Sequence, residues 1–163
     1  MGNTVKLLGA IALCQAAGAI GSFFTMSAIP TWYAQLEKPI FTPPNWLFGP
    51  VWLILYTIMG ISLYRVWQKG KHIQKTENTT IVSSLYLFYV HLVINAYWSI
   101  VFFGMKDLLS ALLIIIILAG LILVLIVKFF QIDRIAGLLL IPYYFWAVYA
   151  VCLNFTIWQL NRI

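Results

Sequence analysis

Long uncharged stretches, separated by short groups of charged residues, set the pattern of hydrophobic and polar positions along this chain. A helix needs about 20 mostly apolar residues to cross the hydrocarbon core of a bilayer. The uncharged stretches, which are each long enough, cover residues 7–36, 39–64, 78–105, 108–127 and 135–161. The pattern therefore predicts five transmembrane helices, at about 7–29, 48–67, 81–104, 108–130 and 135–159.

The apolar runs are continuous and lack the alternation of apolar and polar residues that marks the strands of a membrane β-barrel. We therefore predict an all-α fold, an integral membrane bundle that forms a single domain over residues 1–163. Residues 30–47 are expected to form a loop between the first two helices, and the polar segment 68–80 a solvated connector. The first apolar run is too long for the core of a signal peptide and is interpreted as a membrane span.

Composition supports this class, because 63% of the residues are hydrophobic and only 9% are charged, whereas soluble domains are about 25% charged. A net charge of +6 would suggest nucleic acid binding in a soluble protein. Here it fits the excess of Lys and Arg on the cytoplasmic side of membrane proteins, so we expect no nucleic acid partner. Of the ten Lys and Arg residues, seven are expected on the same side of the membrane as the N-terminus and three on the opposite side. In a bacterial cell membrane the N-terminus would be cytoplasmic, and loop 30–47 would face outward.

Small residues recur every four positions in the first span, at Ala10, Cys14, Gly18 and Ser22. Such a stripe allows close approach of another helix. The partner is either a helix of the same bundle or a second copy of the chain.

In the third span, His91, Asn95 and Ser99 share one helix face, which Trp98 and Phe102 flank. An amide inside the membrane requires a hydrogen-bond partner. Asn95 either ties helices together or meets a ligand, and His91 is interpreted as a bonded structural histidine rather than a proton relay. Since no acidic residue falls inside a span, a proton-coupled transporter has little support.

The second and fifth spans carry aromatic residues at helical spacing. Phe48, Trp52 and Tyr56 are four residues apart, and the fifth span has a similar row that consists of Pro142, Trp146, Ala150, Asn154 and Trp158. Aromatic faces on three helices favour a site for a large, flat, mostly apolar ligand over one for an ion or a sugar. The alternatives are plain aromatic packing of a small bundle and, for Trp158, the membrane-interface belt.

These positions belong to an ordered set that resembles the translocator protein family, also called tryptophan-rich sensory proteins or peripheral benzodiazepine receptors. The set spans most of the chain and comprises Trp32-Tyr33, Leu36, Lys38-Pro39, Pro43-Pro44, Phe48, Pro50-Val51-Trp52, Leu55-Tyr56, Asn95, Trp98-Ser99, Phe102-Phe103-Gly104, Ile141-Pro142-Tyr143, Trp146, Ala150, Leu153-Asn154, Trp158 and Asn161.

The resemblance implies a five-helix membrane bundle, commonly a homodimer, surrounded by lipid. It also implies binding of porphyrins such as protoporphyrin IX, of heme, and of isoquinoline carboxamide and benzodiazepine ligands, with no other cofactor and no metal site. Carried over by position, the pocket residues are Trp52, Asn95, Trp146 and Ala150, followed by Tyr33, Pro44, Phe48, Trp98, Phe102, Tyr149 and Asn154. Asn95 and the Trp52 indole are the expected hydrogen-bond donors to the ligand. The sterol pattern described for animal members is absent, because the first basic residue after Tyr149 is Arg162, beyond the reach of that pattern.

A membrane receptor or carrier that transports, senses or regulates tetrapyrroles is therefore the leading hypothesis. An alternative implied by the family is light- and oxygen-dependent degradation of porphyrin, for which Trp52 and Trp146 would be the reactive side chains; no nucleophile–base pair points to other catalysis. A purely structural or interaction protein is a further alternative.

The loop at 30–47 is unusually rich in prolines, which fix φ and restrain the preceding residue. The prolines that stiffen it are Pro39, Pro43 and Pro44, and Pro50 follows near the start of the next helix. We predict that this loop is a stiff lid over the pocket; the alternative is a rigid connector without contact to a ligand.

Overall fold

Five long helices make up the fold of the computed structural model, which describes residues 2–70 and 78–162. Two of them end in a π-helical turn, labelled η. The elements are α1 (Asn3–Ala28), η1 (Ile29–Tyr33), α2 (Asn45–Gly70), α3 (Asn78–Ser99), η2 (Ile100–Gly104), α4 (Leu108–Ile132) and α5 (Arg134–Asn161). Each of the five is long and apolar enough to cross a membrane. The predicted all-α fold with five spans is thus confirmed.

The helix boundaries differ from the predictions most at the first loop. The first helix was expected to end at about residue 29 but continues through Pro30 to Tyr33, and α2 begins at Asn45 instead of 48. The connection therefore shrinks from 30–47 to residues 34–44. Pro50 falls inside α2, in its second turn. Part of the polar connector predicted at 68–80 lies outside the described residues.

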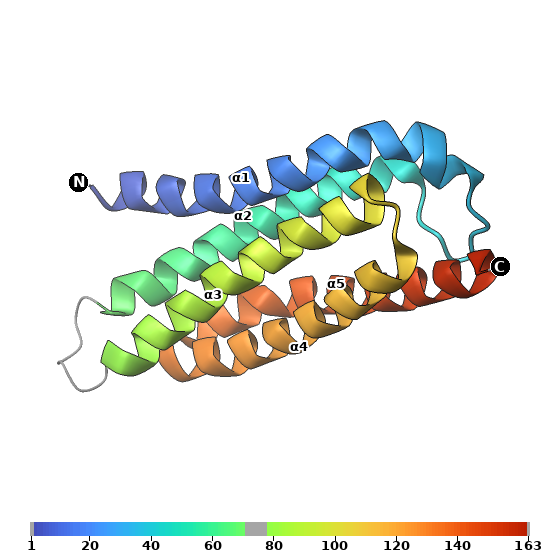
Figure 1. The fold of residues 1–163 in the computed structure, drawn as a ribbon. Coiled ribbons are helices and arrows are strands. Elements are labelled where there is room, and N and C mark those ends of the chain that lie inside the picture. Colours follow the sequence, from blue (N-terminus) through green and yellow to red (C-terminus); the bar gives the residue numbers. More distant parts are fainter. Residues whose placement is uncertain (1, 71–77, 163) are drawn as a thin grey trace.

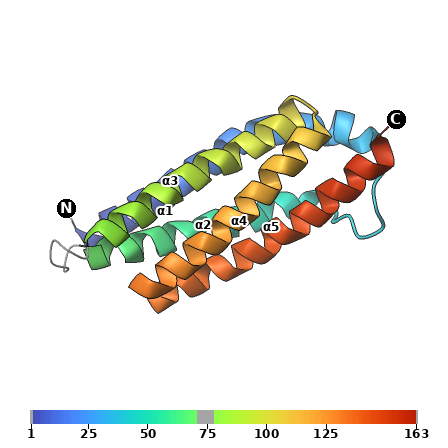
Figure 2. The ribbon, with the colours of Figure 1, turned by 60° about the horizontal axis from the view of Figure 1, so that its bottom comes forward.

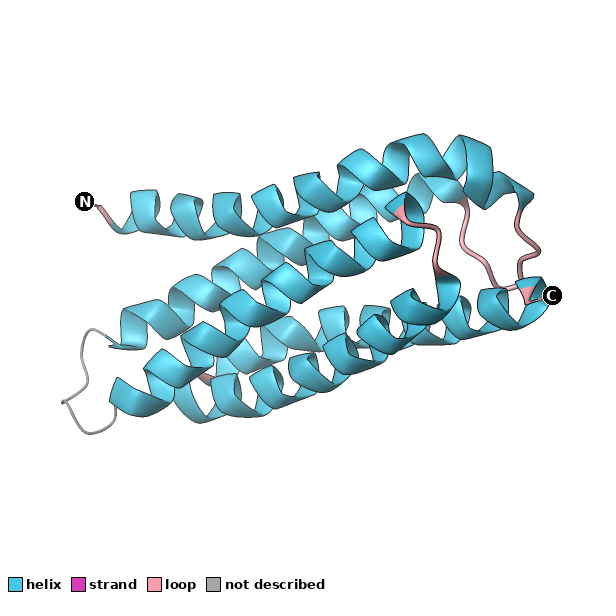
Figure 3. Cartoon of the chain, viewed as in Figure 1, coloured by secondary structure: helices cyan, strands magenta, loops and turns pink. Residues whose placement is uncertain are grey.

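The helices run side by side as an elongated bundle (Figures 1 and 2). Contacts between α1 and α2, α2 and α5, α5 and α4, α4 and α3, and α3 and α1 close a ring. The connection between η1 and α2, the short turn between η2 and α4, and the C-terminus lie at the same end of the bundle (Figure 3). We call this the loop end. The N-terminus and the turn between α4 and α5 lie at the opposite end.

Aspartates start both C-terminal helices. Asp107 accepts hydrogen bonds from the backbone N–H of Ser110 at 3.0 Å and from its hydroxyl at 2.6 Å. Asp133 accepts from the backbone N–H of Ala136 at 2.8 Å. Such N-caps satisfy donors that a helix leaves unpaired at its first turn. The very short turns between these membrane helices thus end in well-defined helix starts.

The small residues of α1 pack inside the bundle. A Cβ added at Gly18 would collide with the ring of Tyr56 on α2, and one added at Gly21 would lie 2.9 Å from the Ser99 hydroxyl on α3. Gly60 of α2 lies against the backbone of Ile11 in return. The stripe therefore packs within the bundle at Cys14 and Gly18, whereas Ser22 is exposed. The dimer stays a prediction.

Candidate ligand-binding site

Aromatic side chains from four segments enclose a small cavity in the half of the bundle nearest the loop end. Tyr33 comes from η1, and α2, α3 with η2, and α5 supply the remainder. The lining residues are Tyr33, Phe48, Trp52, Trp98, Phe102, Phe103, Trp146, Tyr149, Ala150, Leu153 and Asn154. All the residues that the sequence predicts for a pocket, except Asn95 and Pro44, line this cavity. Whether they bind a ligand stays a prediction.

Two lining residues were missed by the sequence analysis. Phe103 follows Phe102 directly, and neighbours in an α-helix point about 100° apart. The π-helical turn η2 brings both rings into the cluster, where their centroids lie 4.7 Å apart. Leu153 is three residues beyond Ala150, so it shares the same face of α5. A search for both i+3 and i+4 neighbours would have found Leu153, but no sequence signal marks the π turn.

The cavity is nearly filled by its own walls. Phe48 packs edge-on against Tyr33, with ring centroids 6.3 Å apart, and against Trp146 at 6.4 Å, and Trp146 lies 5.4 Å from Tyr149. The remaining volume is about 30 Å³, close to the space that one water occupies. Sites for drug-sized ligands enclose about 300–1,000 Å³. A large ligand therefore requires side chains or helices to move apart.

Beneath the cavity, Asn95 forms the centre of a buried hydrogen-bond network. The Tyr56 hydroxyl donates to its Oδ1 at 2.6 Å, and its Nδ2 donates to the Tyr143 hydroxyl at 2.5 Å. Trp52 stacks on Tyr56 at 5.3 Å and meets the edge of Tyr143 at 6.4 Å. Asn95 is 1% exposed and does not line the cavity. It ties α2, α3 and α5 together, and because it is buried beyond the cavity lining, a ligand could reach it only if neighbouring side chains moved.

His91 lies one turn before Asn95 and is completely buried. Its Nδ1 is 2.5 Å from the backbone oxygen of Phe88, and its ring packs against those of Phe88 and Tyr143 at 4.8 and 5.8 Å. These contacts fit a structural histidine.

The cavity wall contains one buried polar group without a partner. Tyr33 is 2% exposed, and among the described residues nothing forms a hydrogen bond with its hydroxyl. An unsatisfied buried hydroxyl costs about 1–3 kcal/mol. By contrast, the Asn154 amide accepts from the Trp98 indole at 3.4 Å and donates to the backbone oxygen of Leu108 at 3.0 Å. The Tyr33 hydroxyl is therefore a group that a bound ligand can satisfy.

The loop at residues 34–44 is fastened to α5. The Tyr149 hydroxyl donates to the backbone oxygen of Phe41 at 2.7 Å, and the two rings lie 6.3 Å apart. The Asn161 side chain forms two bonds with the backbone of Glu37, accepting at 3.0 Å and donating at 2.9 Å. The loop thus spans from η1 to the end of α5 and returns to α2 (Figures 1 and 3). Because Tyr149 also lines the cavity, loop and cavity share a side chain.

Lys38 closes the end of the first helix. Its ammonium donates to the backbone oxygens of Tyr33 and Leu36, both at 2.8 Å, and lies 5.1 Å from the centre of the Tyr33 ring. Cations stabilise the C-terminal end of a helix, where carbonyls lack partners. Lys38 thereby fixes the residue that carries the unpaired hydroxyl.

A second hollow of about 350 Å³ lies on the other side of Trp52, as a groove between α1 and α2. Phe48 and Trp52 line both hollows. Gly18 and Gly21 leave room on α1, and the exposed side chains of Met26 and Trp46 flank the groove. These two rings are therefore the wall between the small cavity and a larger space at the side of the bundle.

Comparison with known proteins gives the chain its family. The chain is 43% identical over 159 residues to the tryptophan-rich protein TspO of Archaeoglobus fulgidus, which covers 98% of this chain and 99% of the relative. It is 41% identical over 155 residues to the protein of the same name from Chlorobaculum tepidum, covering 93% and 92%. The translocator protein of Homo sapiens is 34% identical over 144 residues, covering 88% and 82%. Residues 10–159 match the TspO/MBR family, and the chain belongs to that family.

Proposed function

We propose that this protein is a membrane receptor or carrier that binds a flat tetrapyrrole, such as protoporphyrin IX or heme, in the aromatic cavity. The observation that carries the proposal is the convergence of tyrosine, tryptophan and phenylalanine rings from four segments on one cavity inside the membrane. Aromatic walls bind flat apolar molecules through stacked and edge-on contacts. Isoquinoline carboxamide and benzodiazepine ligands share this chemistry and are proposed for the same site.

Binding of such a ligand enlarges the cavity by taking in the space of the groove between α1 and α2. Rotation of the Trp52 and Phe48 rings would join the cavity of about 30 Å³ to the groove of about 350 Å³, and together they fall at the lower end of the range for drug-sized sites. The ligand carbonyl or carboxylate would then accept a hydrogen bond from the Tyr33 hydroxyl and from the Trp52 indole. Loop 34–44 acts as the lid, and its bonds to α5 retain the ligand.

Tryptophan fluorescence of the purified protein in detergent tests this proposal. Protoporphyrin IX is expected to quench the fluorescence with saturation, and replacing both Trp52 and Trp146 by Ala to weaken binding by about tenfold or more, because each ring contributes a large contact area. Trp67→Phe, at the opposite end of the bundle, serves as the matched control. An unchanged affinity of the double variant for protoporphyrin IX would refute the assignment of the binding site to this cavity.

A second activity, oxidation of the bound porphyrin in light, is supported by the position of Trp52 and Trp146 on one cavity. Molecular oxygen would be the oxidant that takes electrons from the porphyrin, and both indoles would lie against the ligand, where each can lend an electron to the excited porphyrin and pass through a radical state. Spectra recorded under illumination, with and without oxygen, test this activity. Equal product formation without oxygen, or with Phe at both positions, would refute it.

The remaining aspects of the proposal concern topology. We infer that the N-terminus is cytoplasmic and that the protein lies in a bacterial cell membrane, because most Lys and Arg gather at the end opposite the loop. Cysteine labelling from either side of the membrane tests the orientation. The family suggests a homodimer, which cross-linking in native membranes tests.

A further inference from the structure

A polar hollow of about 330 Å³ lies at the end of the bundle opposite the aromatic cavity. Its lining comes from the last two turns of α2 and from the residue before α5, and consists of Tyr64, Arg65, Gln68, Lys69 and Asp133. Asp133 stands between the last residue of α4 and the first residue of α5. Because both helices cross the membrane, the hollow lies at the boundary between membrane and water.

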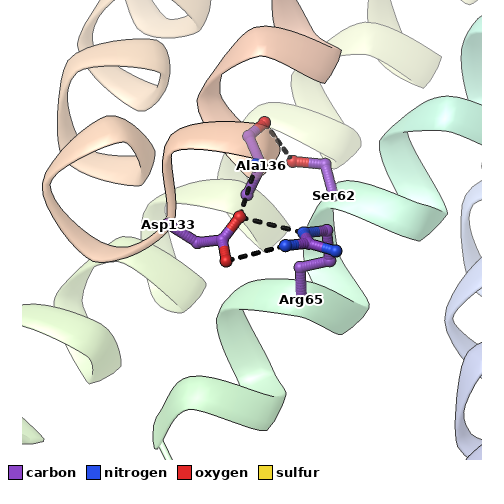
Figure 4. Close-up of polar contacts among 4 residues, drawn as sticks. All are labelled: Ser62, Arg65, Asp133 and Ala136. Carbon is purple, nitrogen blue, oxygen red and sulfur yellow. Dashed lines mark hydrogen bonds and ion pairs between the residues drawn. The ribbon is translucent and has the colours of Figure 1, made fainter.

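The guanidinium of Arg65 is held in a fixed position in this hollow. Its Nε and Nη2 donate to the two carboxylate oxygens of Asp133 at 2.9 and 3.0 Å. Figure 4 shows this fork, with Asp133 also bonded to the N–H of Ala136 and the Ser62 hydroxyl bonded to the Ala136 carbonyl beside it. Asp133 is 7% exposed and Arg65 34%. No hydrogen bond to Nη1 is found among the described residues, so a pre-positioned donor remains for a ligand.

The hollow carries an uncompensated positive charge. Lys69 follows Arg65 by one helical turn and is exposed, and within the described part of the chain its ammonium has no ion pair. Lys69 and Asp133 line the same hollow, and hydrogen bonds from Arg65, with a smaller contribution from the charge of Lys69, lower the pKa of Asp133. Two cations thus face a single carboxylate. Tyr64 accepts a hydrogen bond from Gln68 at 2.7 Å, which leaves its own hydroxyl proton to donate.

We propose that this hollow binds the phosphate group of an anionic phospholipid, with Nη1 of Arg65, the Lys69 ammonium and the Tyr64 hydroxyl as donors. The single negative charge of a phosphodiester matches the net charge of the hollow. Arginine and lysine together suit phosphate oxygens, and basic pockets between transmembrane helices on the cytoplasmic side bind anionic headgroups. The first turns of α5 present exposed Ile135 and Leu138, which give the acyl chains apolar surface next to the headgroup.

Native mass spectrometry of the protein in neutral detergent tests the proposal. The probes are dioleoylphosphatidylglycerol and dioleoylphosphatidylcholine, which have equal acyl chains. We expect the anionic lipid to bind more tightly, and Lys69→Gln to weaken its binding about fivefold, the contribution of one basic residue near such a phosphate. Phosphatidylcholine has the same phosphodiester, but its choline cancels the charge, so its weaker binding should fall by a smaller factor. Lys69 is exposed and distant from the aromatic cavity, so porphyrin binding should not change.

Arg134→Gln provides the matched control, because Arg134 is an exposed cation at the same end that does not line the hollow. We expect less than a twofold loss from it. Equal losses of lipid affinity in the two variants would mean that the lipid binds a diffuse basic surface, and would overturn the proposal. Displacement of the lipid by inorganic phosphate or glycerol phosphate at similar concentrations would likewise overturn it in favour of a soluble anion.

Discussion

Asn95 allows a prediction whose size follows from its two hydrogen bonds. The amide joins the hydroxyls of Tyr56 and Tyr143, at 2.6 and 2.5 Å, in the interior of the membrane bundle. Hydrogen bonds between transmembrane helices contribute about 0.6–1.7 kcal/mol each. Asn95→Ala removes both and leaves two buried hydroxyls unpaired, so we expect destabilisation by about 2–5 kcal/mol. With about 2–4 °C per kcal/mol for a chain of this size, Tm should fall by roughly 4–20 °C.

Thermal melting in detergent, with Tyr56→Phe and Tyr143→Phe alongside, measures this effect. Each tyrosine variant breaks one bond and should cost less than Asn95→Ala. A triple variant with Leu at position 95 and Phe at both tyrosine positions should recover part of the loss, because replacing all partners by apolar groups leaves nothing unsatisfied. A Tm of Asn95→Ala within about 1 °C of the parent, or a triple variant no more stable than Asn95→Ala, would refute the reasoning.

The same variants address the untested prediction that Asn95 contacts the ligand. Tyr143→Phe frees the Nδ2 of Asn95, the donor that a ligand carbonyl or carboxylate would need, without removing the amide. If a bound ligand competes with Tyr143 for this donor, its affinity should rise in Tyr143→Phe and fall in Asn95→Ala. Equal porphyrin affinity in both variants would assign Asn95 to the fold alone.

Three further predictions concern the ends of the bundle and its packing. Hydrogen bonds from Arg65 lower the pKa of Asp133, so the stability that Asp133 contributes is present above about pH 4 and is lost as the pH falls through the lower folded pKa. Asp133→Asn should therefore reduce Tm at neutral pH by several degrees and make the fall of Tm with acid shallower, measured by melting between pH 3 and 7. Gly18→Ala should destabilise the protein because its Cβ meets an aromatic ring, whereas Gly9→Ala, with nothing within 4 Å of its Cβ, should be neutral or stabilise by up to about 1 kcal/mol; equal melting of the two would contradict the packing. Tyr149→Phe loses the bond to the backbone oxygen of Phe41, and if the loop is a lid, porphyrin dissociation in stopped-flow fluorescence should quicken about two- to tenfold, while an unchanged rate would argue for a rigid connector.

Much of the fold could be read from the sequence, because the cost of burying charges in hydrocarbon separates the spans so clearly. Spacing of i+4 also placed Phe48 with Trp52 and Trp146 with Ala150 on faces that do meet at one cavity. Helix ends were harder to predict. The first helix was predicted to end at about residue 29, yet a π turn carries it on to Tyr33.

The details of the site depended on partners from other helices. A polar residue in a span must find a hydrogen bond, but the sequence does not say whether a tyrosine or a ligand supplies it. For Asn95 on α3 the structure supplies Tyr56 from α2 and Tyr143 from α5. Likewise, the fastening of Glu37 to Asn161 joins positions 124 residues apart. Neither pair leaves a periodic signal along the chain.

The two π turns have a consequence for insertions and deletions. They pack on each other, with the ring of Phe102 lying 5.7 Å from Trp32 and 6.3 Å from Tyr33. Each turn holds one more residue per hydrogen bond than an α-helix, and a helix rotates by about 100° per residue. Deleting one residue from Ile29–Tyr33 would restore α-helical bonding but swing the residues beyond it out of phase with η2. The number of residues in Ile29–Tyr33 is therefore fixed by the direction in which Tyr33 must point. A deletion here would need a compensating deletion or insertion in η2 or in the loop after η1.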